Sequence, residues 1–279
     1  MRMEKKLTSK QIVIVVGGPI GVLAVSWLLY NWLGNVAFLF PPVLIGMLLA
    51  YLVVESRHYQ LGLFVRSLEE SRAQYSQIES ILGLTLAIDP IVPLPSTRGW
   101  AASPDLLRAV YGHVLAEQPQ LVVEASSGTS TIVIAYALKK LGKGQVIALE
   151  HEAEYAERTR KNIAAHGLSD HATVVLAPLV MQECKGETYE WYDLSKLQLP
   201  GTIDLLLVDG PPDTIRPMAR YPAVPLLAER FSRNTSVFLD DGGRDDERRT
   251  ATQWDMQFNA HTTEYLFLEK GGWLLRFQK

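Results

Sequence analysis

The chain has 279 residues, of which 48% are hydrophobic and 20% are charged, and its formal net charge at pH 7 is −3. This length suits one large domain with an added segment. The slightly negative charge, with no basic stripe, argues against nucleic acid as a partner. The single cysteine, Cys184, excludes an internal disulfide framework and a cysteine-rich metal site.

The N-terminal part carries no charged residue between Gln11 and Val54. This run is too long for one membrane-spanning helix, because a hydrocarbon layer of ~30 Å takes about 20 helical residues. Two spans fit it better, at about residues 12–30 and 36–54, with a break in the sequence NWLGN between them. Residues 1–56 are therefore predicted to form a membrane anchor, a transmembrane helical hairpin.

Lysine and arginine residues lie outside both spans and are absent from the break between them. The positive-inside rule then places both ends in the cytoplasm, which predicts a multi-pass protein of the cell membrane with a cytoplasmic catalytic domain. A cleaved signal peptide fits less well, because its apolar region is shorter. The pair Pro41-Pro42 leaves open a re-entrant hairpin that never crosses the membrane.

Residues 57–99 are predicted to connect the anchor to the globular part, as a juxtamembrane helix followed by a proline-rich link at residues 89–100. Within residues 57–82, apolar residues recur at heptad spacing, interrupted only at Ser71. The stripe could pair two protomers as a homodimeric coiled coil, or it could pack on the catalytic domain of its own chain. Its members are Leu61, Phe64, Leu68, Tyr75, Ile78 and Leu82.

Residues 100–279 alternate between helical and strand patterns. Helices are predicted at residues 104–116, 130–141, 152–166, about 216–231 and about 245–257, and strands at residues 120–124, 145–150, 172–177, 203–209 and 236–240. A loop containing EWYDLSKL follows the third strand, and the segments TTEYLFLE and WLLRFQK predict a closing antiparallel hairpin. The fold class predicted is α/β, a Rossmann-like, doubly wound and mostly parallel sheet with a C-terminal antiparallel hairpin.

Carboxylates follow most of the predicted parallel strands, at the sheet edge where such folds bind ligands. They are Glu124, Glu150, Asp209 and the pair Asp240-Asp241. Each could cap the next helix, but together they would repel one another unless a cation or a hydroxyl-rich ligand offset their charge. Glu150 is placed to accept two ribose hydroxyls. Glu124 precedes a loop of small residues with one glycine, where a carboxylate would repel a pyrophosphate and suits a positively charged ligand.

Four segments, VVEASSGTST, VIALEHEAEYAERTRKNI, IDLLLVDGPP and VFLDDGGRDDE, resemble the successive motifs of the class I S-adenosylmethionine-dependent methyltransferases. The resemblance covers about residues 100–279 and implies S-adenosylmethionine as cofactor. It implies that Glu124 and the loop residues hold the methionine part, that Glu150 binds the ribose, and that His151 and Leu179 lie near the adenine. The loop residues concerned are Ser126, Ser127, Gly128 and Ser130.

Two of these loop serines, Ser126 and Ser130, stand where the family usually has glycine. Serine is small enough for the cofactor to approach the backbone closely, provided that neither position needs a positive φ. A positive φ at either serine would weaken the cofactor assignment.

The resemblance further implies that Asp209 lies between cofactor and acceptor. Asp209, Asp240 and Asp241 are also similar to the acids that bind a divalent cation such as Mg²⁺ in catechol-type and some sugar O-methyltransferases, where the metal holds two acceptor oxygens. Gly242 stands where a catechol-type third ligand, asparagine, would be. In the alternative, Asp209 only positions the acceptor or the cofactor amine, and the pair caps the next helix.

Two further clusters are predicted near this edge: EWYD at residues 190–193, and Arg216, Arg220 and Tyr221. Aromatic and arginine side chains in such loops suit an acceptor pocket for a sugar or an acidic group. The alternative is that the aromatic residues pack within a lid and that the arginines are solvated.

We therefore expect a membrane-anchored methyltransferase that transfers the methyl group to oxygen, with Asp209 and Asp241 as catalytic candidates. The anchor favours a membrane-proximal or saccharide-like small-molecule acceptor. Two alternatives remain, an aminopropyltransferase-like enzyme on the same fold and a non-catalytic cofactor-binding membrane scaffold.

Overall fold

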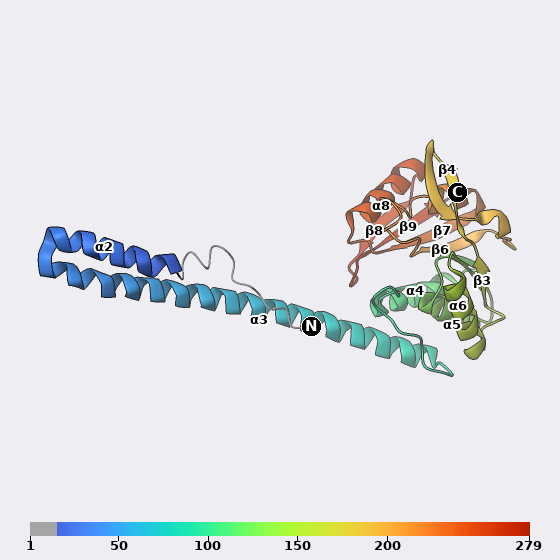
Figure 1. Cartoon of the computed structure of the whole chain (residues 1–279). Coiled ribbons are helices and arrows are strands. Elements are labelled where there is room, and N and C mark those ends of the chain that lie inside the picture. Colours follow the sequence, from blue (N-terminus) through green and yellow to red (C-terminus); the bar gives the residue numbers. More distant parts are fainter. Residues whose placement is uncertain (1–15) are drawn as a thin grey trace. The chain divides into compact units, whose positions relative to one another are not determined.

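The computed structural model of the chain describes residues 16–279, so the start of the first predicted span, residues 12–15, lies outside the described residues. The chain divides into two compact units, with the boundary between Ser71 and Arg72 (Figure 1). The two units are described separately.

The first unit is a pair of helices joined by a short 3-10 segment. Helix α2 (Gly18–Leu33) is followed by η2 (Gly34–Leu39) and by the start of α3 (Phe40–Ile88), and α2 folds back alongside α3 (Figure 1). The break therefore falls slightly later than predicted. Pro41 and Pro42 do not disrupt α3, because they lie in its first turn, where the backbone N–H groups have no partner within the helix.

The side chains of this helical pair are apolar and mostly exposed, as at Leu23, which is 71% exposed, and Trp32, which is 90% exposed. With 16 residues, α2 is about 24 Å long at 1.5 Å per residue, which is shorter than a hydrocarbon layer of ~30 Å. A helical hairpin is thus present at the predicted place, but two complete membrane spans stay a prediction.

Helix α3 continues without interruption to Ile88, so the predicted second span and the juxtamembrane helix form a single helix. Its last part belongs to the second unit, where Gln77, Ser80, Leu84 and Ile88 are buried. Gln77 is paired with Asp105 of α4, since its Nε2 donates to Oδ2 at 2.8 Å and its Oε1 accepts from the Asp105 backbone N–H at 3.2 Å. The apolar stripe lies on a different face, and there Tyr75, Ile78 and Leu82 are more than half exposed.

The second unit contains a seven-stranded sheet with the order β3-β2-β1-β6-β7-β9-β8. Five neighbouring strands are parallel, while β9 runs antiparallel to both β7 and β8, so the predicted α/β fold with a closing antiparallel hairpin is confirmed. The strands are β1 (Leu121–Ala125), β2 (Gln145–Glu150), β3 (Ala172–Leu176), β6 (Ile203–Val208), β7 (Phe231–Asp240), β8 (Thr262–Leu266) and β9 (Gly272–Gln278).

Helices cover both faces of this sheet, and each face has its own apolar core. Strand alternation divides the side chains: Val122 and Leu205 point into one core, and their neighbours Val123 and Leu206 point into the other. The first core is closed by three helices that are grouped on one side of the sheet in Figure 1, and the second contains residues of α8. These helices are α4 (Pro104–Glu117), α5 (Thr129–Leu141), α6 (Ala153–Ala165) and α8 (Asp245–Phe258).

The prediction of one helix at about residues 216–231 is wrong. Only α7 (Ala223–Leu227) and the 3-10 turn η4 (Ala228–Arg230) form there, and β7 already begins at Phe231 instead of Ser236. Pro217, Pro222 and Pro225 remove backbone donors and restrict the residues before them, which prevents a long helix.

The loop predicted after β3 contains an antiparallel hairpin, β4 (Leu179–Cys184) and β5 (Glu187–Tyr192). Lys185 and Gly186 connect the two strands, and both have a positive φ, of 54° and 84°. A two-residue connection with positive φ at both positions is typical of tight hairpins with a glycine. The hairpin places Trp191 and Tyr192 in the second core, where they are 0% and 1% exposed.

Candidate active site

The carboxyl ends of β1, β2, β6 and β7 meet at one edge of the sheet, and two adjoining cavities of about 470 and 440 Å³ lie there. We call the pair the trough. Both cavities are lined by Gly99, Trp100, Ser126, Tyr155 and Asp209, so they are continuous.

The predicted site residues divide between the two cavities. Ser127, Gly128 and Ser130 line the first cavity only. Glu150, His151 and Asp241 line the second cavity only. Three predicted residues, Glu124, Leu179 and Asp240, do not line the trough, and Leu179 begins strand β4 instead.

Glu124 is completely buried behind the small-residue loop. Its two oxygens accept hydrogen bonds from the hydroxyls of Ser130 and Thr131, the second at 2.7 Å, and Thr131 Oγ1 accepts from the Gly128 N–H at 3.0 Å. Burial raises the pKa of Glu124 to about 7, although these hydroxyls oppose the shift. The carboxylate thus holds the loop in its conformation, and its contact with a methionine group stays a prediction.

Ser126 has a φ of 133°, in the region that side chains rarely adopt, while Ser130 lies inside helix α5. The condition that neither serine takes a positive φ is therefore not met at Ser126. Such a conformation costs on the order of 1–3 kcal/mol and persists only where the surroundings impose it. Here the Ser126 N–H is held by the Leu149 carbonyl at 3.1 Å. The loop alone therefore does not establish a cofactor site.

Glu150, at the end of β2, is fixed by three donors. Its Oε1 accepts from the backbone N–H groups of His151, at 2.8 Å, and Glu152, at 3.1 Å, and its Oε2 accepts from Ser127 Oγ at 2.8 Å. Burial alone would raise the pKa of Glu150, but the His151 side chain and the hydrogen bonds from the Glu152 N–H and Ser127 outweigh it and keep the pKa below its ordinary value. A carboxylate has about four acceptor positions, so this ionised group keeps about one for a ligand hydroxyl. The His151 ring also contacts this carboxylate, with its Nδ1 3.1 Å from Glu150 Oε1, and this contact raises the pKa of His151.

Asp209, Asp240 and Asp241 come together as predicted, with one oxygen of each carboxyl group within 4.8 Å of the others. We call these residues the acid cluster. Arg220 lies among them: its Nη2 is 2.7 Å from Asp241 Oδ2 and 3.4 Å from Asp209 Oδ1, and its Nη1 donates to the Asp240 carbonyl at 3.0 Å. The Arg220 side chain is only 5% exposed, so the interpretation of this arginine as solvated is wrong.

Burial raises the pKa of Asp209 and of Asp240, and neighbouring acids of the cluster raise both further, whereas the Arg220 charge opposes the shift. Burial alone would lower the pKa of the Arg220 guanidinium, but the surrounding carboxylates outweigh this effect and raise the pKa. Arg220 is therefore a permanent cation, and burial makes the Asp209 carboxylate more basic than an ordinary aspartate.

A segment that sequence reasoning treated only as a link, residues 95–102, forms one wall of the trough. We call it the strap. Thr129 Oγ1 donates to the Ser96 carbonyl at 3.1 Å, and Lys270 Nζ donates to the carbonyls of Gly99 and Ala101 at 2.9 and 3.0 Å. Trp100, which is 87% exposed, lies in this wall. A tryptophan at the end of a proline-rich stretch was the one available signal in the sequence.

Of the second predicted cluster, Arg220 lines the trough, whereas Arg216 and Tyr221 pack within the domain. The guanidinium of Arg216 lies 3.8 Å from the ring centre of Tyr189, and its Nη2 pairs with Glu187 at 3.2 Å. Of residues 190–193, Tyr192 is the one that lines the trough, and its hydroxyl approaches Gly210 so closely that a Cβ at this glycine would lie 2.3 Å from it.

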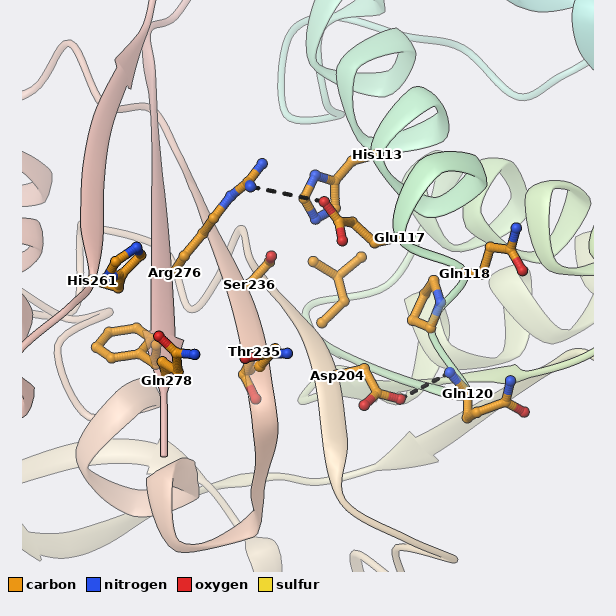
Figure 2. A pocket seen from close by; sticks show the side chains of 14 residues that line it. His113, Glu117, Gln118, Gln120, Asp204, Thr235, Ser236, His261, Arg276 and Gln278 are labelled. Carbon is orange, nitrogen blue, oxygen red and sulfur yellow. Dashed lines mark hydrogen bonds and ion pairs between the residues drawn. The ribbon is translucent and has the colours of Figure 1, made fainter.

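A third cavity, of about 450 Å³, lies at the opposite edge of the sheet, near the amino ends of β1 and β6 (Figure 2). Asp204 Oδ2 there accepts from the backbone N–H of Gln120 at 2.8 Å, and Arg276 approaches Glu117 of α4 at 3.8 Å. These contacts join strand ends and α4, and none of the predicted site residues lines this cavity.

Comparison with known proteins agrees with this geometry. Residues 125–242 match a family described as a methyltransferase domain. The sequence matches none of the curated proteins with which it was compared.

Among solved structures, an O-methyltransferase from Bacillus cereus in complex with S-adenosylhomocysteine is similar, with 18% identity and a TM-score of 0.50 over 75% of this chain and 97% of that chain. A methyltransferase from Podospora anserina bound to S-adenosylhomocysteine has 12% identity and a TM-score of 0.52 over 76% of this chain and 96% of that chain. At such low identity, the structural similarity shows a common fold.

The fold and the family match together confirm the resemblance to the class I S-adenosylmethionine-dependent methyltransferase superfamily. More particularly, the second unit shares its fold with the O-methyltransferase and the methyltransferase named above, both bound to S-adenosylhomocysteine.

Proposed function

We propose that the chain is a membrane-attached O-methyltransferase that uses S-adenosylmethionine. The observation that carries this proposal is Glu150, whose carboxylate is fixed by three donors at the end of β2, in the trough that the loop residues and Asp209 also line. A fixed, ionised carboxylate at this strand end suits a ribose hydroxyl. The neighbouring acid Glu124 favours a ligand whose other end is positively charged.

The cofactor supplies a methyl group on a positively charged sulfur. An acceptor oxygen would take this methyl group as the S–C bond breaks, S-adenosylhomocysteine would leave with the electron pair of that bond, and the acceptor proton would pass to a base of the chain. Asp209 is the proposed base, since it lines both cavities and burial raises its pKa above the ordinary value of an aspartate. The walls of the trough contribute by aligning the two reactants and excluding water.

The direct test is calorimetry with S-adenosylhomocysteine, followed by transfer of a labelled methyl group from S-adenosylmethionine to membrane extracts. Tight binding and labelled product are expected, and labelled product should disappear in Asp209→Asn. Binding of decarboxylated S-adenosylmethionine in preference to the intact cofactor would favour the aminopropyltransferase alternative. Binding without turnover on any extract would favour the scaffold, and absence of binding would refute the proposal.

The proposed acceptor is a membrane-proximal or saccharide-like molecule, and the supporting observation is the first unit. The helical stretch Gly18–Ile88 is long and apolar enough to cross a membrane by length and composition. Only 6% of its most apolar window is buried, whereas the core helix of a soluble domain would be mostly buried. We infer attachment to the cell membrane by this hairpin, with the second unit in the cytoplasm.

This attachment can be tested by fractionation. The full chain should stay with membranes after alkaline carbonate extraction. The double variant Leu23→Arg, Leu49→Arg places a charge on each helix and should be released. Charge changes of the same kind at exposed positions of the second unit, such as Met256→Arg, are the matched control. Release of the unchanged chain by carbonate would contradict the proposed anchor.

The stripe of α3 is proposed to pair two copies of the chain. Its residues Tyr75, Ile78 and Leu82 are exposed, while the domain-facing side of the same helix uses Gln77, Ser80 and Leu84. Light scattering in detergent should give the mass of a dimer for the full chain and of a monomer for Ile78→Glu. A monomeric parent chain would contradict the pairing.

A further inference from the structure

Arg220 stands at the position where the acid cluster would hold a divalent cation. We propose that the guanidinium of Arg220 takes the place of this cation, so that methyl transfer at the trough does not depend on a bound metal. The chemical part of this inference rests on the proposed methyl transfer, whereas the exclusion of metal rests on the geometry of Arg220 alone.

The arginine contacts every member of the cluster. Its Nη2 lies 2.7 Å from Asp241 Oδ2 and 3.4 Å from Asp209 Oδ1, and its Nη1 lies 3.0 Å from the carbonyl oxygen of Asp240. A Mg²⁺ ion needs oxygens at roughly 2.0–2.1 Å in a nearly octahedral arrangement. The Asp240 carboxyl oxygens have no hydrogen-bond partner, but an ion bound between them and the other two acids would lie against a guanidinium that already pairs with one oxygen each of Asp209 and Asp241 and repels a second positive charge.

The guanidinium also faces a fourth acid on its other side. Arg220 is 5% exposed, and its Nε lies 3.8 Å from Glu247 Oε1. Arg244 Nη1 adds a second cation 3.1 Å from the same Asp241 oxygen. Two arginines thus compensate the charge of Asp241, which leaves little for an external ion.

This arrangement has a consequence for the acceptor. A metal ion in such enzymes binds two neighbouring acceptor oxygens, whereas a guanidinium binds oxygen through N–H donors of fixed direction. Arg220 lines the cavity that also contains Glu150 and Asp209. The acceptor therefore needs one hydroxyl or anionic oxygen that accepts a hydrogen bond, and a catechol-like pair of oxygens is not required.

The test is a titration of the metal-free full chain with Mn²⁺, in which electron paramagnetic resonance measures the free ion. Binding would appear as a loss of the free Mn²⁺ signal. The unchanged chain is expected to leave the signal intact, and its affinity for S-adenosylhomocysteine should be the same in EDTA and in Mg²⁺. Micromolar Mn²⁺ binding that Asp241→Asn abolishes would overturn the proposal.

Three variants sharpen the test. Arg220→Ala frees the carboxylates and is expected to bind about one Mn²⁺ per chain, with a gain of thermal stability in its presence. Arg244→Ala, which removes the more exposed arginine from the same Asp241 oxygen, is the matched control and should bind none. Arg220→Lys keeps a cation in place and should also bind none.

Mn²⁺ binding by Arg220→Lys would overturn the proposal, and so would a folded Arg220→Ala that binds no Mn²⁺. If Arg220→Ala does not fold, the unchanged chain and the lysine variant still decide. Failure of the unchanged chain to bind S-adenosylhomocysteine would refute the proposed function, while the Mn²⁺ result would remain a separate answer on the metal.

Discussion

Replacement of Glu150 by glutamine tests the cofactor assignment at its best-defined contact. Three donors already fill three of about four acceptor positions on this carboxylate, so one position remains for a ribose hydroxyl. A hydrogen bond to a charged group contributes about 1.5–3 kcal/mol, and one between neutral groups about 0.5–1.5 kcal/mol. Glutamine can keep the shape and the backbone contacts, so Glu150→Gln should lose about 1–1.5 kcal/mol, or roughly tenfold in affinity.

Glu150→Ala should lose more, because it removes the ribose contact and leaves the His151 and Glu152 N–H groups without their acceptor. We expect at least a further tenfold loss for alanine. The assay is calorimetry with S-adenosylhomocysteine, and Glu157→Gln is the control, because this side chain is 56% exposed and does not line the trough. The reasoning fails if Glu150→Gln binds as well as the parent chain, or if the control loses as much affinity.

Three other changes probe the same edge of the sheet. Ser126→Gly should raise the free energy of unfolding by about 1 kcal/mol, since it relieves a φ of 133°, and urea denaturation measures this; a loss would contradict the strain. Because the folded pKa of Glu124, about 7, lies above its ordinary 4.5, the folded state keeps a proton that the unfolded state releases. Stability should therefore fall by about 3 kcal/mol as pH rises through this window, and Glu124→Gln should flatten the fall; an unchanged profile would refute the shift. Gly210→Ala should be destabilised by its clash with the Tyr192 hydroxyl, and Tyr192→Phe should restore part of the loss in a double-mutant cycle.

The strands and the strand-end acids were predictable because buried parallel strands are continuous apolar runs. Leu205, Leu206 and Leu207 exemplify this, since alternate members enter opposite cores and all must be apolar. Each run ends where the chain leaves the sheet, so the position of Glu150 or Asp240 in space follows from its position in sequence. The acids were therefore found without knowledge of any contact.

The residues that were missed or misjudged come from irregular segments. Arg220 was seen, but a loop rich in proline gives no periodicity that would show whether its side chain turns inward. The strap is also irregular, and its place depends on contacts with Lys270, far away in sequence. Hairpin β4–β5 differs, because Lys185-Gly186 between β-forming residues was a readable turn signal.

The two sides of the trough balance their negative charge by different means, and this difference indicates which ligand each side receives. Within residues 16–279, neither Glu124 nor Glu150 forms an ion pair with lysine or arginine; hydroxyls and backbone N–H groups hold them instead. Of the two, only Glu150 lines the trough, and its charge suits a ligand that carries positive charge, as the ammonium and sulfonium groups of S-adenosylmethionine do. On the other side, Arg220 offsets Asp209 and Asp241 from within the chain. That side therefore needs no external cation. Because it already holds Arg220, it suits an acceptor oxygen that develops negative charge as it loses its proton.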